Sequence, residues 1–253
     1  MRTIFSAVKA WFSGLQITPS SIPPVEPGIR ASFQTDKKVL KKFYENILVE
    51  CFHSHDLDSK RLFLSNVRSG DYNVLLVEEV NEAGVDEILG GIVIEHSWSM
   101  GKKVMLIAWV GVSEKHRGRD IGTLLVSEAI SYAKSHEALI LLGEVENPEE
   151  YEEEESGYGN PERRVRFYSR FDCKRLEVPY VVQVGGGAEE FGMMLTLFPL
   201  SEEQSAATEI SIPEFALFMT ELVGMDGTEA SEALIESAQG TVKMTSYREL
   251  YNF

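Results

Sequence analysis

The chain has 253 residues, 43% of them apolar, which is enough for one large domain with appendages or for two small domains. Its net charge of −16 argues against nucleic acid or an anionic membrane surface as the main partner. No run of 18 apolar residues is present, so we expect no transmembrane segment. Two cysteines far apart, Cys51 and Cys173, are typical of a reducing compartment, and we expect a cytoplasmic protein.

The first fifteen residues contain Arg2 and Lys9 but no acid, and their apolar residues repeat at helical spacing. This pattern predicts an amphipathic helix that docks on the protein's own body or on a second subunit of a homodimer. A targeting peptide or a membrane-surface helix is the alternative, although the h-region and cleavage site of a secretory signal are missing. A proline-rich link at 20–28 completes this N-terminal arm, residues 1–30.

The next elements are predicted from changes in the apolar period. Apolar residues at helical spacing indicate a helix from Asp36 to Phe52 with Asp36 as its N-cap, and a shorter helix from about Asp58 to Val67. Strand-like runs rich in β-branched residues follow. Short connections favour antiparallel pairing of three successive strands: Asn73–Val80, Ile88–His96 and Val104–Val112.

The second half begins with a basic loop at 115–122 and a helix that ends near Ser135. The almost wholly apolar run Ala138–Val145 is typical of a strand covered on both faces. A helix over Glu162–Phe171 and two strands joined by a glycine turn are expected next, the strands at Leu176–Val184 and Phe191–Phe198. Residues 201–253 hold no Lys or Arg before Lys243, and they predict an acidic helical extension with helices over Glu214–Val223 and Thr228–Ala238.

The basic loop, KHRGRDIG in one-letter code, connects a strand directly to a helix N-terminus. Free N–H groups and the helix dipole at such a position favour an anion, which is the physics needed to bind a pyrophosphate. Neither a dinucleotide-binding G-x-G-x-x-G nor a P-loop lysine motif is present. Asp120 at the centre of the loop is unusual, because its carboxylate would repel a phosphate. We expect phosphate binding to be weakened without being abolished, with the side chain pointing away from the phosphates and the backbone N–H still available. The structural alternative is a carboxylate that caps the start of the helix.

Three motifs in this order resemble the GNAT family of N-acetyltransferases. In the loop, Arg117, Asp120 and Gly122 take the places of Arg or Gln, Gly, and Gly or Ala, so the middle glycine is missing. The strand end 141–147 resembles the family's Leu-Glu-Val stretch followed by Asn. The segment 166–172 resembles its Phe-Tyr-x-x-x-Gly-Phe helix end, with Asp172 in place of glycine. The resemblance covers residues 31–200 and implies a mixed α/β fold with a mixed sheet, the acyl-CoA N-acyltransferase fold.

The resemblance implies acetyl-CoA as co-substrate. Exposed backbone groups near Val110 and Val112 would pair with the pantetheine arm. The loop would hold the pyrophosphate through Arg117, Gly118, Arg119, Asp120, Ile121, Gly122 and Thr123. Glu144 matches the position of the general base, and Tyr168 matches the proton donor to the departing thiolate. Glu144 is alternatively an ordinary strand-end residue, in which case Glu146 is the other candidate, and Tyr168 is alternatively an ordinary packing aromatic.

Two further clusters concern the acceptor. His53, His55 and Asp56 lie in the loop after the first helix, which lines the acceptor pocket in this family. A metal is not expected there, because no second Cys/His pair supports one. The acidic run at 149–155 is either a solvated loop or a lid that attracts a cationic amine.

The sequence therefore predicts an enzyme, an acyltransferase that moves an acetyl group from acetyl-CoA to the amine of a small molecule or a protein. The alternative is a non-catalytic acetyl-CoA-binding or protein-interaction module. Asp120 and Asp172 at glycine positions support the alternative, whereas Glu144 and Tyr168 speak against it.

Overall fold

The computed structural model describes residues 28–80, 86–99, 102–150, 160–180, 182–184, 188–190, 192–210 and 241–253. The predicted N-terminal helix lies outside these residues, as does the acidic run from Tyr151 onward. The predicted helices Glu214–Val223 and Thr228–Ala238 also lie outside them.

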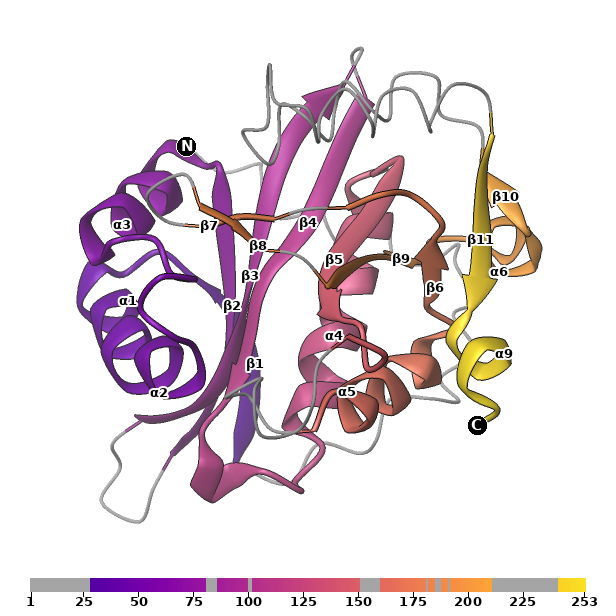
Figure 1. Cartoon of the computed structure of the whole chain (residues 1–253). Helices are drawn as coiled ribbons and strands as arrows, with labels where there is room; N and C mark the ends of the chain where they lie inside the picture. Colours follow the sequence, from indigo (N-terminus) through magenta and orange to yellow (C-terminus); the bar gives the residue numbers. More distant parts are fainter. Residues whose placement is uncertain are drawn as a thin grey trace.

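A mixed nine-stranded sheet forms the centre of the molecule, in the order β1-β2-β3-β4-β5-β9-β6-β11-β10 (Figure 1). Its β4–β5 pair is parallel and its other pairs are antiparallel. A separate hairpin pairs β7 with β8. The mixed α/β fold class predicted from the sequence is confirmed. The strands are β1 (Ile29–Gln34), β2 (Tyr72–Val80), β3 (Asp86–Ser99), β4 (Lys102–Val112), β5 (Ile140–Glu146), β6 (Lys174–Leu176), β7 (Val182–Val184), β8 (Ala188–Glu190), β9 (Met193–Phe198), β10 (Glu209–Ile210) and β11 (Val242–Ser246).

Helices cover both faces of this sheet. The α4 face, named for its largest helix, carries α4 (Ile121–Ser135) and α5 (Pro161–Tyr168), with the short α9 (Tyr247–Tyr251) nearby. The opposite α1 face carries, in chain order, α1 (Lys37–Phe43), the π-helical turn η1 (Tyr44–Leu48), α2 (Val49–Cys51) and α3 (Lys60–Ser69). Alternate residues of β2 serve the two faces: Leu75 and Val77 join the apolar cluster of α4, whereas Val74 and Leu76 join that of α1.

The predicted helix starts are largely confirmed. The Asp36 carboxylate accepts hydrogen bonds from the amides of Lys38 and Val39, at 2.8 and 3.0 Å, and so caps α1. The second helix starts at Lys60, two residues later than predicted, because the Ser59 hydroxyl caps it. The π-helical turn was not predicted, since its sequence does not depart from α-helical spacing.

The predicted strand Leu176–Val184 is wrong as one element. It ends as β6 at Leu176, and β7 starts only at Val182. Pro179 lies between them and has no N–H to donate to a ladder, which explains the break. Likewise, the predicted strand Phe191–Phe198 is observed as β9 from Met193.

The C-terminal segment contains two strands, β10 and β11, that the sequence did not predict. Its β11 pairs with β6 in the main sheet, and Val242 and Met244 are buried there. The short α6 (Glu202–Ala206) and α9 are its described helices. Tyr247 is fully buried and its hydroxyl hydrogen-bonds to Thr196 of β9. The two described strands of 201–253 therefore belong to the main sheet.

Candidate functional site

A gap between β4 and β5 organises the candidate site. The two parallel strands pair only from Val104–Ile140 to Ile107–Gly143, although β4 runs on to Val112 and β5 to Glu146. Beyond Ile107, the edge of β4 that faces β5 has no strand partner within the described part of the chain. The predicted pantetheine-binding residues Val110 and Val112 both lie in this length, where no strand pairs with the edge, although the Val112 carbonyl accepts from side chains of Cys51 and Arg117.

Gly143 marks the point where the strands diverge. A Cβ atom built there lies 2.9 Å from the Phe198 ring, too close for any larger residue. The same ring packs edge-on against Tyr168, with 5.6 Å between ring centroids. The predicted proton donor is therefore held beside the gap, on the α4 face.

Asp120 adopts a left-handed backbone conformation, with φ 55°, where α4 begins. Its side chain makes no capping bond to the first turn of α4, so the capping alternative is wrong. The capping geometry requires an extended backbone at this position, and the left-handed one turns the side chain away. The amides of Ile121, Gly122 and Thr123 are consequently left to an anion.

Asp172 shows the same conformation, with φ 54°, at the second position where the family motif has glycine. Asp and Asn tolerate left-handed backbone better than other residues with a Cβ. Both aspartates thus preserve the backbone that glycine would adopt. The chain departs from the motif in residue type, but both positions have a backbone conformation that glycine favours.

The basic residues of the loop are not equivalent. Arg119 forms an ion pair with Glu79 of β2, at 2.9 Å, and this pairing lowers the pKa of Glu79. Lys115 and the half-buried His116 both contact Glu87 of β3. Arg117 instead lies exposed, and its Nε donates to the carbonyl of Val112 at 3.4 Å. Of the two arginines, Arg117 is directed at the end of the gap.

Tyr168 is held in its neutral form. Burial raises its pKa to about 12, and the nearby thiol of Cys173 adds to this effect. The helix that carries it is fixed by Asn160, whose side chain accepts from the amide of Arg163, and by Pro161 in its first turn. A neutral hydroxyl at neutral pH suits a proton donor.

Carboxylates gather on the other face of the gap. Glu144 follows Gly143 on β5 and therefore points to the α1 face, where the hydroxyl of Tyr180 donates to its carboxylate. Glu95 of β3 lies on the same face, opposite Leu106 of β4. Burial raises the pKa of Glu95 to about 7, with further contributions from the charges of Glu144, Asp58 and Asp71. The sequence did not single out Glu95, because no motif contains it.

The loop after α2 approaches this face through its backbone and through Asp58. The Trp109 indole donates to the carbonyl of Asp56 at 3.0 Å, and the Tyr72 hydroxyl donates to the Asp58 carboxylate at 2.9 Å. His53 and His55 are exposed and stack on each other, and His55 contacts the Asp56 carboxylate. No group of His, Cys, Asp and Glu side chains within the described residues is arranged to hold a metal.

Glu146 takes part in a structural ion pair. It is buried at the end of β5 and forms an ion pair with Arg164 of α5. It thus differs from Glu144, two residues earlier on the strand, whose carboxylate accepts from a tyrosine. This favours Glu144 over Glu146 as the functional carboxylate.

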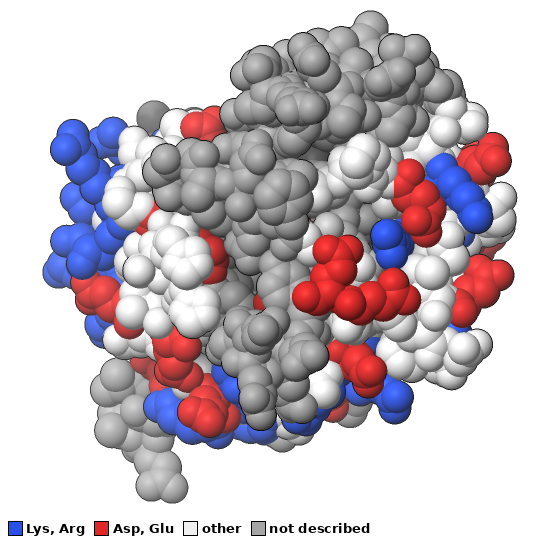
Figure 2. Space-filling model, viewed as in Figure 1, with Lys and Arg blue, Asp and Glu red and all other residues white. Residues whose placement is uncertain are grey.

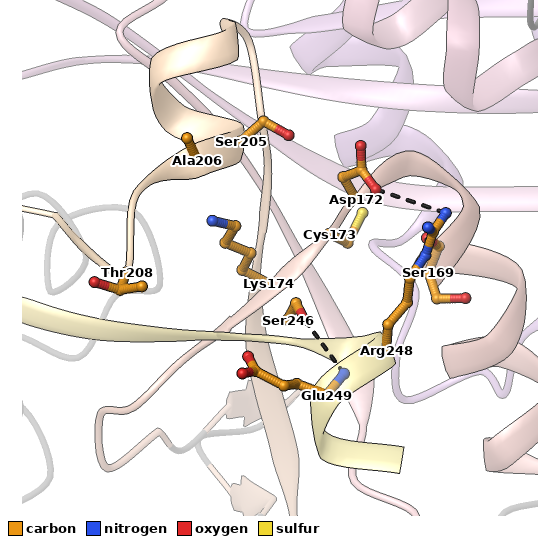
Figure 3. Close-up of a pocket in the computed structure, with 10 residues that line it drawn as sticks. All are labelled: Ser169, Asp172, Cys173, Lys174, Ser205, Ala206, Thr208, Ser246, Arg248 and Glu249. Atoms are coloured by element: carbon orange, nitrogen blue, oxygen red, sulfur yellow. Dashed lines mark hydrogen bonds and ion pairs between the residues drawn. The ribbon is translucent and has the colours of Figure 1, made fainter. Parts of the chain in front are cut away.

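A separate cavity of about 330 Å³ lies beyond the turn that joins α5 to β6 (Figure 3). The buried Lys174 is in its wall and donates to the carbonyl of Ala207. None of the predicted site residues lines it. Its lining residues are Ser169, Asp172, Cys173, Lys174, Ser205, Ala206, Thr208, Ser246, Arg248 and Glu249.

A mixed sheet whose central parallel pair diverges beside a helix N-terminus defines the class: this is the acyl-CoA N-acyltransferase fold. Residues 40–152 match the model of the Acetyltransferase (GNAT) family, which confirms over that segment the resemblance read from the motifs and supports an acyltransferase. A search of curated proteins finds no match. No helix among the described residues is long and apolar enough to cross a bilayer.

Solved structures similar to this chain include two Arabidopsis thaliana proteins. Naa50, in complex with a bisubstrate analogue, is 15% identical over 67% of this chain and 97% of its own, with a TM-score of 0.47. NAA60, in complex with acetyl-CoA, is 15% identical over 67% and 98%, with a TM-score of 0.46. A GNAT family acetyltransferase from Elizabethkingia anophelis with acetyl-CoA bound is 17% identical over 68% and 97%, with a TM-score of 0.43.

Proposed function

We propose that the protein transfers the acetyl group of acetyl-CoA to a cationic amine, carried by a small molecule or by a protein. The observation that carries the proposal is the gap between β4 and β5. It has the start of α4 at one end, a neutral tyrosine on one face and carboxylates on the other. This arrangement offers an anion site, a backbone edge and acid–base groups in one place.

The co-substrate would occupy the gap. The loop amides from Arg117 to Thr123 would hold the pyrophosphate, aided by the Arg117 guanidinium. Arg119 would contact the pyrophosphate only if its ion pair with Glu79 were broken. The edge of β4 at Val110 and Val112 would pair with the amides of the pantetheine arm.

The chemistry then needs one base and one acid. The acceptor ammonium loses a proton to a carboxylate, its nitrogen forms a bond to the acetyl carbon, and the carbon–sulfur bond breaks. The leaving thiolate receives the proton of the Tyr168 hydroxyl, the amide nitrogen loses its second proton to solvent, and solvent restores the proton of Tyr168. We assign the base to the pair Glu144 and Glu95. Glu144 is the family position, and the pKa of Glu95 near 7 suits proton transfer at neutral pH.

The carboxylates on the α1 face also indicate the class of acceptor. Glu144 and Glu95, with Asp58 close enough to affect the Glu95 pKa, would attract a cation before it loses its proton. Buried tyrosines hold two of these carboxylates in place: Tyr180 donates to Glu144 and Tyr72 donates to Asp58.

The test is acetyl-CoA binding by calorimetry, followed by transfer to a panel of diamines, polyamines and peptides with free N-termini, measured as thiol release and product mass. We expect binding and transfer to at least one cationic amine, and loss of transfer in Glu144→Gln but not in the exposed control Glu209→Gln. Absence of acetyl-CoA binding would contradict the proposal. Binding without transfer to any amine would favour the non-catalytic module instead.

A further inference from the structure

Basic residues concentrate on the outer surface of α1 and α3. Figure 2 shows them as a blue patch at the left edge of the molecule, where these two helices lie, while the lower edge and the right side carry acidic and basic residues side by side. The concentration stands out in a chain of net charge −16. The patch consists of the exposed residues Lys37, Lys38, Lys41, Lys42, Lys60, Arg61 and Arg68.

A groove of about 820 Å³ runs through this patch, between α1 and α3. Its apolar floor contains Leu40, Leu64 and Val67, which are buried or half-buried. Five of its ten lining residues are basic: Lys37, Lys41, Lys60, Arg61 and Arg68. None of the candidate site residues lines it, so the groove is separate from the gap between β4 and β5.

The charges of the groove are largely uncompensated. Lys60 pairs with Glu45 at 2.6 Å, and the charge of Lys41 also lowers the pKa of Glu45. Lys37, Arg61 and Arg68 form no ion pair within the described part of the chain. The carboxylate of Asp36 is used by the amides that it caps. Lys37 and Lys41 stand four residues apart on one helix, an arrangement that destabilises a helix. This local repulsion would be relieved by an anionic partner.

We propose that the groove between α1 and α3 binds a short acidic peptide segment of a partner protein. Charge complementarity defines the partner's acidity, and the apolar floor fits aliphatic side chains between its acids. A long polyanion is disfavoured, because it would extend past the patch and lie against the acidic surface of the rest of the protein. Charges within a Debye length of about 8 Å of that surface would be repelled. A peptide confined to the groove meets mainly the five basic side chains that line it.

The binding test uses an eight-residue peptide of alternating Glu and Leu, blocked at both ends and labelled for fluorescence anisotropy. Its control replaces each Glu by Gln. We expect the acidic peptide to bind, its affinity to fall about tenfold when salt is raised from 50 to 500 mM, and the Gln peptide not to bind measurably. Equal binding of both peptides, or no binding of either, would overturn the proposal.

A pair of double variants locates the site. Lys41→Glu with Arg61→Glu should weaken peptide binding by about tenfold or more, because two attractive charges become repulsive. The matched control, Lys134→Glu with Lys243→Glu, makes the same charge change at exposed positions outside the groove and should keep most of the affinity. If both variants lose affinity equally, the binding is non-specific attraction and the groove is not the site. Tighter binding of a single-stranded RNA or of phosphatidylserine vesicles than of the peptide would also overturn the assignment.

Discussion

The two faces of the sheet differ sharply where β4 and β5 diverge. On the α4 face, Tyr168 lies in an apolar cluster against Phe198. Gly143 of β5 faces the Phe198 ring on that side. The next residue, Glu144, lies on the α1 face and belongs to a group of carboxylates and tyrosines. A single strand thus presents an apolar surface on the α4 face and an acidic surface on the α1 face.

The same physical effect gives the two faces opposite roles. Burial raises the pKa of Tyr168 to about 12, so this hydroxyl keeps its proton at neutral pH and is available to donate it. Burial also raises the pKa of Glu95, to about 7, so this carboxyl gains and loses its proton near neutrality. Removing a proton donor from one face and a carboxylate from the other should therefore have different pH signatures.

The largest effect is expected on the α4 face. Tyr168→Phe should lower turnover by roughly 100-fold, within the usual range for acid–base groups, while acetyl-CoA affinity changes little. Steady-state kinetics and calorimetry measure the two quantities. Tyr132→Phe, which removes a half-buried hydroxyl elsewhere on this face, is the matched control. Unchanged turnover in Tyr168→Phe would remove the residue from the mechanism and leave the face purely structural.

The next effect concerns the α1 face and the pH dependence of stability. The folded-state pKa of Glu95 lies above its unfolded value of 4.5, so its contribution to stability is complete below pH 4.5 and is lost as pH rises through about 7. Glu95→Gln removes this loss. Its free energy of unfolding, relative to the parent, should therefore rise between pH 5 and pH 8 by an amount on the order of 2 kcal/mol.

Denaturant titrations at several pH values measure this difference, and the exposed Glu149→Gln serves as control. Parallel pH profiles of Glu95→Gln and parent would show that burial does not raise the pKa of Glu95. If Glu95 is also the base, the turnover of the parent should rise with pH through about 7, and Glu95→Gln should lose that step.

A smaller effect distinguishes the two arginines of the loop. Arg117→Gln should weaken acetyl-CoA binding by roughly fivefold, the magnitude of about 1 kcal/mol for a partly exposed charged contact. Arg119→Gln should change it less, because Glu79 already engages that guanidinium. Calorimetry of both variants decides between them, and a larger loss in Arg119→Gln would reverse the assignment.

The smallest effect concerns the left-handed turn at Asp120. Asp120→Ala should lower the free energy of unfolding by about 1 kcal/mol, since alanine lacks the tolerance of Asp for this backbone. Asp120→Gly should leave it nearly unchanged and should tighten acetyl-CoA binding several-fold, because a negative charge beside the pyrophosphate is removed. Thermal melts and calorimetry test the pair. Weaker acetyl-CoA binding in Asp120→Gly would mean that the carboxylate shapes the loop.

The sequence predicted which residues of the α4 face lie near the gap, but it missed most of those on the α1 face. Tyr168 and the loop lie in motifs with fixed spacing, and the helices that carry them show clear apolar periods. Glu95 stands in a strand whose neighbours are hydrophobic, and only the pairing of β3 with β4 places it opposite Leu106, next to the start of the gap. Asp58 and Tyr180 come from other parts of the chain, and their nearness to Glu144 and Glu95 depends on tertiary contacts.

Local propensity also explains the errors in the fold. The edge strand β1 was missed because its burial alternates irregularly, and a half-exposed edge carries little periodic signal. The capping alternative for Asp120 used residue type alone, but φ decides whether a carboxylate faces the helix. Pairing of β11 with β6 joins residues far apart in the chain, which no local pattern reports.

That last pairing has a consequence for how the protein folds. Strands β2, β3 and β4 follow one another along the chain, so their contacts form by closing short loops. The β11–β6 contact requires a much longer loop to close, which costs more chain entropy and slows such steps. We expect the sheet to assemble from its β2–β4 part first and the β6–β11 edge to join late. Until then, the apolar residues that Val242 and Met244 cover would remain open to solvent and to association with other unfinished chains.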